Sequence, residues 1–241
     1  SLKYEIDNGA YPPILIPERF AWSNYVKVFE ENNFFLYFWN SVLVTGAATI
    51  LALVIGVPAG YGIARLKAEK SAVVIMIARM TPGLSFLIPL FLLFQWLNLL
   101  GTLWPQIIIH LVVTVPIVVW IMIGYFETTP KELEEAATSL GATRWQIFYK
   151  VILPSITPAL MTGFAMAFAR AVGEYGSVIF IAGNMPMISE ITPLIIIGKL
   201  EQYDYAGATA VAVVMLLISF VLLLVINALQ AWQRRHAGAP A

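Results

Sequence analysis

Hydrophobic residues dominate this chain in five long segments where charged residues are rare or missing. Three stretches, 32–64, 80–126 and 205–233, contain no Asp, Glu, Lys or Arg at all. Each is longer than the ~20 apolar residues that a helix needs to cross the hydrocarbon core of a bilayer. The pattern predicts five membrane-spanning helices, over 41–64, 72–97, 103–126, 156–182 and 206–231.

The sequence between the second and third of these segments has the residues of a turn. Asn98, Gly101 and Pro105 all disfavour a continuing helix. Trp96 and Trp104 flank them, and tryptophan is enriched at the membrane–water interface. We therefore expect the chain to reverse here, close to a membrane surface.

Composition agrees with a membrane protein and excludes several other classes. Hydrophobic residues make up 60% of the chain and charged residues 12%, against roughly half and a quarter in soluble domains. The formal net charge is zero, which offers no electrostatic case for nucleic acid as a partner. The sequence contains no cysteine, so disulfides and thiolate metal sites are excluded. We expect an all-α fold, a polytopic transmembrane helix bundle.

Basic residues near the ends of the spans predict the orientation, because Lys and Arg concentrate on the cytoplasmic side. If the N-terminus lies outside, the cytoplasmic side receives Arg65, Lys67, Lys70, Lys131, Arg144, Lys150, Arg234 and Arg235. The outer side then receives only Lys3, Arg19, Lys27 and Lys199. This predicts a periplasmic segment leading to the first span at 1–40, a transmembrane domain at 41–232 with a cytoplasmic loop at 127–155, and a cytoplasmic tail at 233–241.

The cytoplasmic loop contains the most informative segment, 128–155, which reads TTPKELEEAATSLGATRWQIFYKVILPS. Its first part predicts a short helix, with Thr129 and Glu132 at capping-box spacing and Pro130 in the first turn. Gly141 is placed to end this helix. One apolar stripe lies along this predicted helix at helical spacing; it consists of Leu133, Ala136, Ala137 and Leu140.

The second part of the segment predicts another short helix. Thr143 and Gln146 have the spacing of a second capping box. An apolar face follows and ends before Pro154; it consists of Ile147, Phe148, Val151 and Ile152. The segment therefore predicts a helix, a tight turn and a helix beside the membrane.

Three interpretations of this segment compete on the residues alone. It could be a loop packed against the bundle, a DNA-binding helix-turn-helix, or a docking element for a cytoplasmic partner protein. The acidic residues Glu132, Glu134 and Glu135 oppose DNA, because they would repel the phosphates. Packing and docking both remain open at this point.

The segment resembles a known family. The order Glu135-Ala136-Ala137, then Gly141, then Ile152-Leu153-Pro154, resembles the EAA loop of permease subunits in binding-protein-dependent ABC importers. In that family the short helix inserts into a groove on the ATPase subunit and couples nucleotide-driven closure to movement of the spans. The resemblance implies that ATPase coupling in this chain involves Glu134, Glu135, Ala136, Ala137, Leu140, Gly141, Leu153 and Pro154.

The resemblance also implies partners and a location. The expected partners are an ATP-binding cassette ATPase subunit, a second permease subunit that is identical or related, and a periplasmic or lipoprotein substrate-binding protein, beside membrane lipid. ATP and Mg would be bound by the ATPase subunit, because this sequence has no Gly-rich Gly-Lys-Ser/Thr phosphate loop. The chain is therefore expected to be a transporter subunit and not an enzyme, in the bacterial cytoplasmic membrane.

Two subfamilies are visible along the chain. From Tyr11 to about Glu135, segments such as NYVKVF and GVPAGYGIARL resemble sugar-type and glycerol-phosphate-type permeases, in which a further span precedes the outside segment. From about Leu140, ARAVGEYGSVIFIAGN and LEQYDYAGATAVAVVMLLISF resemble sulfate, thiosulfate and molybdate permeases. The second likeness is long and uninterrupted over the last two spans, so it predicts a sulfate-like oxyanion as the substrate, with a sugar as the alternative.

Three charged residues and one histidine fall inside the predicted spans, where ionisable groups are functional candidates. Arg79 is near enough to its span's cytoplasmic end for its side chain to reach the interface. Arg170 and Glu174 are four residues apart, so they either pair on one helix face or line the translocation path or a gate. Gly173 would then allow the helix to bend, while His110 is expected to form a packing hydrogen bond.

Two rival classes of function remain. A membrane scaffold could use the same loop to dock a soluble protein without transporting anything. A secondary transporter or channel should carry acidic residues at the membrane midplane, often in internally repeated halves. Glu174 is the one such candidate in this sequence, and we find no repeat.

Overall fold

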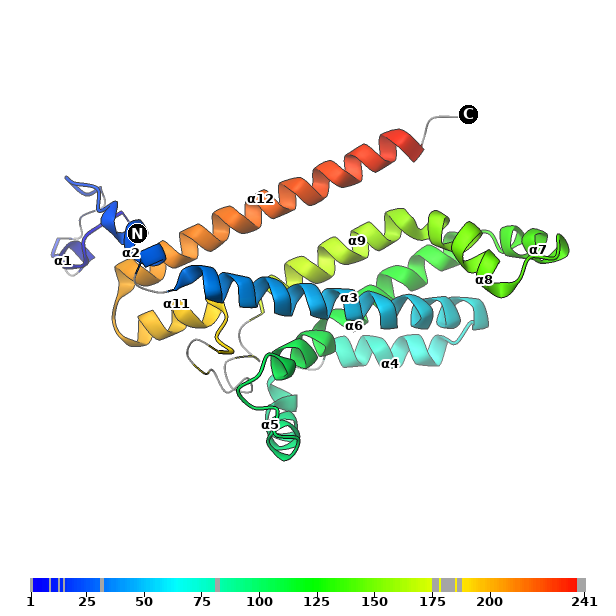
Figure 1. Ribbon diagram of the computed structural model, residues 1–241, viewed down its shortest axis with the longest axis horizontal. Coiled ribbons are helices and arrows are strands. Elements are labelled where there is room, and N and C mark those ends of the chain that lie inside the picture. Colours follow the sequence, from blue (N-terminus) through cyan, green and yellow to red (C-terminus); the bar gives the residue numbers. More distant parts are fainter. Residues whose placement is uncertain are drawn as a thin grey trace. The chain divides into compact units, whose positions relative to one another are not determined.

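The computed structural model describes residues 2–8, 10–12, 14, 16–30, 33–80, 83–174, 178, 185 and 188–237, and all regular structure in them is helical (Figure 1). The first helices are α1 (Glu5–Asn8), α2 (Ser23–Glu30), α3 (Phe34–Leu66), α4 (Glu69–Met80) and α5 (Leu87–Trp96). The others are α6 (Trp104–Thr128), α7 (Glu132–Ser139), α8 (Arg144–Ile147), α9 (Leu153–Val172), α11 (Thr192–Glu201) and α12 (Tyr205–Ala237). The predicted all-α class is confirmed.

Within the described residues, four helical stretches are long and apolar enough to cross a membrane: Phe34–Leu66, Trp104–Thr128, Arg144–Val172 and Tyr205–Trp232. They overlap four of the five predicted spans. The prediction of one continuous helix at 72–97 is wrong, because α4 ends at Met80 and α5 begins at Leu87 after a short 3₁₀ turn, Gly83–Phe86. The intervening sequence contains Pro82, and proline has no N–H to donate and clashes with the preceding turn of a helix.

The predicted turn between α5 and α6 is confirmed. α5 ends at Trp96 and α6 begins at Trp104. Asn98 and Gly101 both have positive φ, of 53° and 80°, a backbone conformation that asparagine and glycine tolerate better than other residues. These two residues allow the chain to reverse between the helices.

The chain divides into two compact units, each built from separate stretches. The first unit comprises Ser1–Gly46, Gly83–Ile109 and Val172–Leu222, and the second comprises Ala47–Pro82, His110–Ala171 and Leu223–Ala241. Each unit has its own hydrophobic cluster of buried side chains. The units are therefore described separately.

In the second unit, the core lies where α3, α6 and α9 run beside one another (Figure 1). Its buried members come from all three helices and the turn before α9; they include Ala52, Val57, Val118, Met122, Phe126, Ile152, Ile156 and Ala159. Helices in lipid associate through such close packing because lipid tails give no hydrophobic drive for helix–helix contact.

The α3 and α6 helices approach each other most closely at two glycines. A Cβ built on Gly56 would lie 2.6 Å from Cγ1 of Val118, and one on Gly60 would lie 2.6 Å from Cβ of Met122. The two glycines are four residues apart, the spacing that lets membrane helices pack backbone to backbone. Contacts that advance by four residues in both helices mean that α3 and α6 run parallel.

In the first unit, the start of α3 packs with α2, α11 and the start of α12. The buried cluster there consists of Val28, Phe34, Tyr37, Ile195, Ala210 and Val211. A polar contact adds to it, because Ser41 of α3 accepts a hydrogen bond from the Thr192 N–H at the first position of α11, at 3.0 Å. The Ser41 hydroxyl thereby satisfies one of the backbone donors that a helix start leaves open.

The start of α12, also in the first unit, is held by two carboxylates. Asp204 accepts a hydrogen bond from the Gly207 N–H at 2.8 Å and forms an ion pair with Lys199 at 2.8 Å. Glu5 accepts a hydrogen bond from the Ala206 N–H at 2.9 Å. Negative charge is favourable at a helix N-terminus. Burial raises the pKa of Asp204, but the hydrogen bonds from Lys199 and Gly207 outweigh it, so the pKa lies below its ordinary value.

A carboxyl group with a lowered pKa stabilises the folded state above its unfolded pKa, and this contribution disappears as pH falls through the folded pKa. An asparagine in place of Asp204 would keep a capping oxygen but lose the charge. We therefore expect Asp204→Asn to lower the thermal unfolding temperature in detergent near pH ~7, with the difference from wild type shrinking as the pH falls through the lowered pKa of Asp204. Circular dichroism melts at several pH values measure this, and a difference that does not change with pH would contradict the assignment.

Candidate functional site

The junction after α7 has the geometry that the sequence predicts. Gly141 has a φ of +80°, its N–H donates to the Thr138 carbonyl, and the Ala142 N–H donates to the Ala137 carbonyl. These two bonds form a Schellman motif, the helix ending that glycine favours. The second capping box is also confirmed, with Gln146 N–H to Thr143 Oγ1 at 3.4 Å and Thr143 N–H to Gln146 Oε1 at 2.8 Å.

The start of α7 differs from the prediction. The predicted capping box of Thr129 and Glu132 is wrong, because α7 begins at Glu132 with Lys131 in the N-cap position. The Thr129 hydroxyl instead donates to the Tyr125 carbonyl at 2.9 Å, in the last turn before α7. α6 continues to Thr128, and the Thr129 side chain bonds back to its final turn. The spacing of the sequence predicts instead that this side chain caps α7.

The second predicted short helix does not end before Pro154. α8, a π-helical turn at Phe148–Ile152 and α9 follow one another without a break, and together they form the membrane-spanning stretch Arg144–Val172. The Leu153 N–H donates to the Phe148 carbonyl, five residues back. Such a widened turn accommodates Pro154, which lacks an N–H and would crowd the carbonyl four residues before it in a regular α-helix.

The apolar stripe on α7 is present, and the described part of the chain buries none of its side chains completely. All eight residues of α7 are described, and none of them is buried. Leu133 is 50% exposed, and Leu140, just after the helix, is 88% exposed. Two aromatic side chains of the following turn are exposed as well, Trp145 and Tyr149, and they stack with ring centroids 6.0 Å apart. An apolar surface of this kind on a short helix is typical of a site for another protein.

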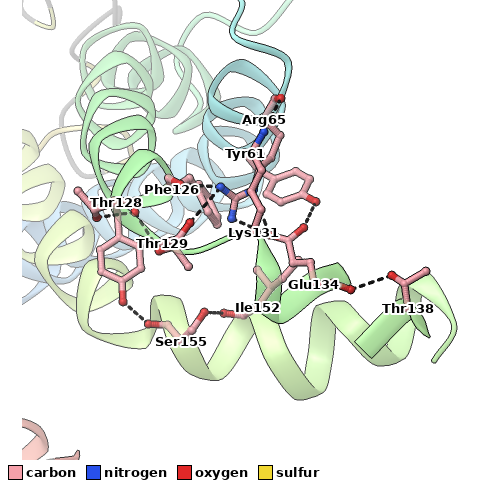
Figure 2. A network of polar contacts seen from close by, with 11 residues as sticks. Tyr61, Arg65, Phe126, Thr128, Thr129, Lys131, Glu134, Thr138, Ile152 and Ser155 are labelled. Atoms are coloured by element: carbon pink, nitrogen blue, oxygen red, sulfur yellow. Dashed lines mark hydrogen bonds and ion pairs between the residues drawn. The ribbon is translucent and has the colours of Figure 1, made fainter. Parts of the chain in front are cut away.

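A neighbouring face of α7 is tied to the bundle through Glu134. The Tyr61 hydroxyl donates to Glu134 Oε2 at 2.6 Å, and Arg65 donates to Glu134 Oε1 from Nε at 3.0 Å and from Nη2 at 2.6 Å (Figure 2). The side chains of Arg65 and Glu134 are only 12% and 18% exposed. A mostly buried, charge-assisted pair of this kind is stronger than an exposed one.

Arg65 also binds the end of α6. Its Nη1 donates to the Phe126 carbonyl at 2.7 Å and to the Thr129 carbonyl at 3.2 Å (Figure 2). Carbonyls at a helix C-terminus lack intrahelical partners and carry partial negative charge, so a cation is favourable there. The end of α6 is further joined to the start of α9, because the Tyr125 hydroxyl donates to the Ser155 carbonyl.

The residues implied by the EAA resemblance therefore divide between two faces. Glu134 points into the bundle, whereas Glu135, Ala136 and Leu140 are exposed. Ala137 and Leu153 are half-buried, Pro154 is exposed, and Gly141 forms the turn. The sequence analysis did not single out Tyr61, and it used Arg65 only to predict orientation. The one sequence signal for Arg65 is that a basic residue ends an apolar helix. A side chain that reaches from the helix end to the membrane interface explains that position as well as an ion pair does.

The predicted pathway residues lie at the end of α9. α9 ends at Val172, so Arg170 is in its last turn and Gly173 forms a turn. The prediction that Arg170 and Glu174 share one helix face is wrong, because Glu174 follows the helix end. The predicted fourth span reaches 182, but 175–177 and 179–182 lie outside the described residues. A role for Arg170, Gly173 and Glu174 in a path or gate stays a prediction.

Two other residues that the sequence placed inside predicted spans can be located. His110 is 1% exposed, and its Nε2 lies 3.1 Å from the Ala171 carbonyl near the end of α9. A carbonyl oxygen only accepts, so Nε2 carries the proton and donates, which agrees with the predicted packing hydrogen bond. Arg79 lies in the last turn of α4, one residue before its end at Met80.

Comparison with known proteins adds family information to this geometry. Residues 52–237 match the family model described as "Binding-protein-dependent transport system inner membrane component". The chain is 48% identical over 126 residues to the sulfate transport system permease protein CysT of Escherichia coli, covering 52% of this chain and 46% of that protein. It is 47% identical over 126 residues to the CysT protein of a Synechocystis species, covering 52% and 44%. The chain spans about half the length of these curated relatives.

Solved structures have a similar fold at low sequence identity. A bacterial ABC transporter involved in the import of the polysaccharide alginate aligns with a TM-score of 0.70 at 15% identity, over 89% of this chain and 84% of that one. The MetNI methionine ABC transporter, in an inward-facing conformation, aligns with a TM-score of 0.61 at 22% identity, over 83% and 94%. At these identities the likeness concerns the fold alone.

Proposed function

The chain belongs to the family of binding-protein-dependent transport system inner membrane components, and from this premise we propose that it is the membrane-spanning permease subunit of an ATP-driven importer. The observation that carries the proposal is the exposed apolar stripe of α7. This stripe follows a span, is not buried by the described residues of the chain, and lies in a segment that resembles the EAA loop. In our account it enters a groove on a separate ATPase subunit.

The ATPase would supply the energy and this chain the passage. ATP and Mg would be bound by the ATPase subunit, whose closure would pull on α7 and shift the spans towards an outward-open state. Release after hydrolysis would return them inward. A second permease subunit, identical or related, would complete the path, and a periplasmic or lipoprotein binding protein would deliver the substrate from outside.

We infer that α7 faces the cytoplasm and that the N-terminal segment lies outside. The distribution of Lys and Arg supports this orientation. The sequence has no cysteine, so single cysteines at Asn24 and Ser139 can be labelled selectively. In intact cells a membrane-impermeant maleimide should label only the first; labelling of only the second would reverse the orientation.

The proposed substrate is sulfate or a similar oxyanion. The support comes from relatives that are named sulfate transport permeases and are 47% and 48% identical over 126 residues. An enzyme-like or purely structural role has less support, because the family is one of transport systems. A sugar would fit the resemblance of the first half of the chain, but no relative reported above carries such a name at comparable identity.

Co-purification tests the proposal. The full-length protein, expressed with candidate ATPase subunits and purified in detergent by a tag on the permease, is expected to retain one ATPase at a fixed stoichiometry. Size-exclusion chromatography with quantified band intensities measures it. If the wild-type protein retains none of the candidate ATPase subunits expressed with it, the importer assignment fails and a scaffold function takes its place.

A further inference from the structure

Docking an ATPase does not by itself move a membrane helix, so a rigid connection between the docking helix and a span is required. Among the described contacts of α7, the strongest converge on Glu134. We propose that Tyr61, Arg65 and Glu134 form a joint that transmits movement of α7 to α3 and to the end of α6. The proposal rests on the proposed function and assigns a positioning role to residues that lie apart from the docking surface.

Hydrogen bonds hold both oxygens of the Glu134 carboxylate. Oε1 accepts two bonds from Arg65 and Oε2 accepts one from Tyr61, so both oxygens are held (Figure 2). The pair is mostly shielded from water, with side-chain exposures of 12% and 18%. Separating such a pair leaves an uncompensated charge in a poorly solvated place, which is strongly unfavourable. The joint should therefore stay closed when α7 is pulled.

The guanidinium of Arg65 connects three helices. Arg65 belongs to α3, binds Glu134 of α7, and donates from Nη1 to the Phe126 and Thr129 carbonyls at the end of α6. Its carbon Cζ also lies 5.8 Å from the Tyr61 ring centroid and 5.9 Å from that of Phe126, within cation–π range. The two rings pack edge to face at 5.2 Å. Movement of α7 must therefore displace α3 and α6 together.

Side-chain packing alone does not fix the position of α7. None of the eight residues of α7, all of which are described, is buried. A cavity of about 440 Å³ lies beside Glu134 and Thr138, and its other walls include Pro58 of α3 and Phe148 of the π-helical turn. An α7 that is not packed tightly against its neighbours depends on discrete polar bonds for its position. The Glu134 joint supplies them.

The joint and the docking surface are separable on α7. Successive helix positions differ by about 100°, so Glu134 lies about 160° from Ala136 and at least about 100° from Leu133 and Leu140, whereas Ala137, the half-buried fourth member of the stripe, borders it. Glu134 is turned to the bundle, while Leu133, Ala136 and Leu140 are exposed. A change at Glu134 should consequently leave ATPase binding intact and impair only the transmission of α7 movement to α3 and α6.

The test compares Glu134→Gln and Tyr61→Phe with Glu132→Gln, a matched control on an exposed side chain of the same helix. Each full-length variant is co-purified with the ATPase and reconstituted with the binding protein, and radiolabelled sulfate transported per ATP hydrolysed is measured. We expect all three variants to retain the ATPase. Glu134→Gln should lower the ratio of sulfate transported to ATP hydrolysed about tenfold, which is within the range of coupling between distant sites. Tyr61→Phe should lower this ratio less, and Glu132→Gln should leave it unchanged.

A spectroscopic measurement separates transmission from a general loss of stability. A variant with two introduced cysteines, at Leu66 and Ser139, carries one spin label on each; both positions are exposed. The labels report the distance between the ends of α3 and α7. A narrow distribution in wild type that broadens in Glu134→Gln supports the joint. Retention of the ATPase with an unchanged ratio and an unchanged distribution in Glu134→Gln would overturn it. Absence of the ATPase from wild type would instead overturn the proposed function, and loss of the ATPase from Glu134→Gln alone would overturn the joint by assigning this residue to docking.

Discussion

Replacement of Leu140 by glutamate is expected to release the partner ATPase while the chain stays folded. Leu140 is 88% exposed, so it contributes little buried area to the permease itself. In the proposed complex it would be enclosed in the groove of the ATPase, where an unpaired carboxylate is costly. Loss of an interface anchor of this type typically costs at least ~2 kcal/mol, which corresponds to about 30-fold weaker binding.

The measurement is the dissociation constant of the detergent-solubilised permease for the ATPase, obtained by titration. Ser139→Glu is the matched control, because it adds the same charge one residue away on a different face of α7. Circular dichroism should show equal helix content in both variants. Equal affinity of Leu140→Glu and wild type would remove the α7 stripe from the interface, whereas equal weakening by both variants would point to a general charge effect.

Gly60→Ile is expected to prevent the second unit from packing. Even a single Cβ at Gly60 would lie 2.6 Å from Cβ of Met122, 3.2 Å from the Val119 carbonyl oxygen and 3.3 Å from the Ile123 nitrogen. These atoms belong to the α6 backbone or its first side-chain carbon, so they can move only if the helices separate. Overpacking typically costs about 1–3 kcal/mol, and a branched side chain should reach the upper end of that range.

Gly62→Ala provides the control for this prediction. Among the described atoms, nothing lies within 4 Å of a Cβ at Gly62, so the added methyl group meets open space. We expect Gly62→Ala to melt at or slightly above the wild-type temperature and Gly60→Ile to melt well below it or to aggregate on extraction. Thermal melts in detergent, followed by circular dichroism, decide this. Similar melting temperatures for the two variants would contradict the close α3–α6 contact.

Much of the fold follows from local sequence, and the exceptions have local physical causes. Charge-free apolar stretches predict α3, α6 and α12 because a membrane helix needs little more than length and hydrophobicity. The same criterion misjudges 72–97, since hydropathy does not register the helix-breaking effect of Pro82. The expectation that proline ends a helix fails at Pro154, where the π-helical turn at Phe148–Ile152 lets the helix continue through that residue.

The candidate site was predictable only in part. The turn at Gly141 and the capping box at Thr143 are local, so spacing predicts them correctly. Thr129 fails as a cap because a hydroxyl can equally donate to the turn before it. The Arg65–Glu134 pair joins residues far apart in the sequence, and it arises only after α3 and α6 have packed in parallel. No local pattern records such a pair.

ATP-dependent uptake of sulfate tests the central claim most directly. The full-length protein, its ATPase and its binding protein are reconstituted into vesicles, and accumulation of radiolabelled sulfate is followed with and without ATP on the ATPase side. The account predicts that wild-type vesicles accumulate sulfate only with ATP and that Leu140→Glu vesicles accumulate none. ATP-driven uptake of a neutral sugar without sulfate, or sulfate uptake that survives Leu140→Glu, would contradict it.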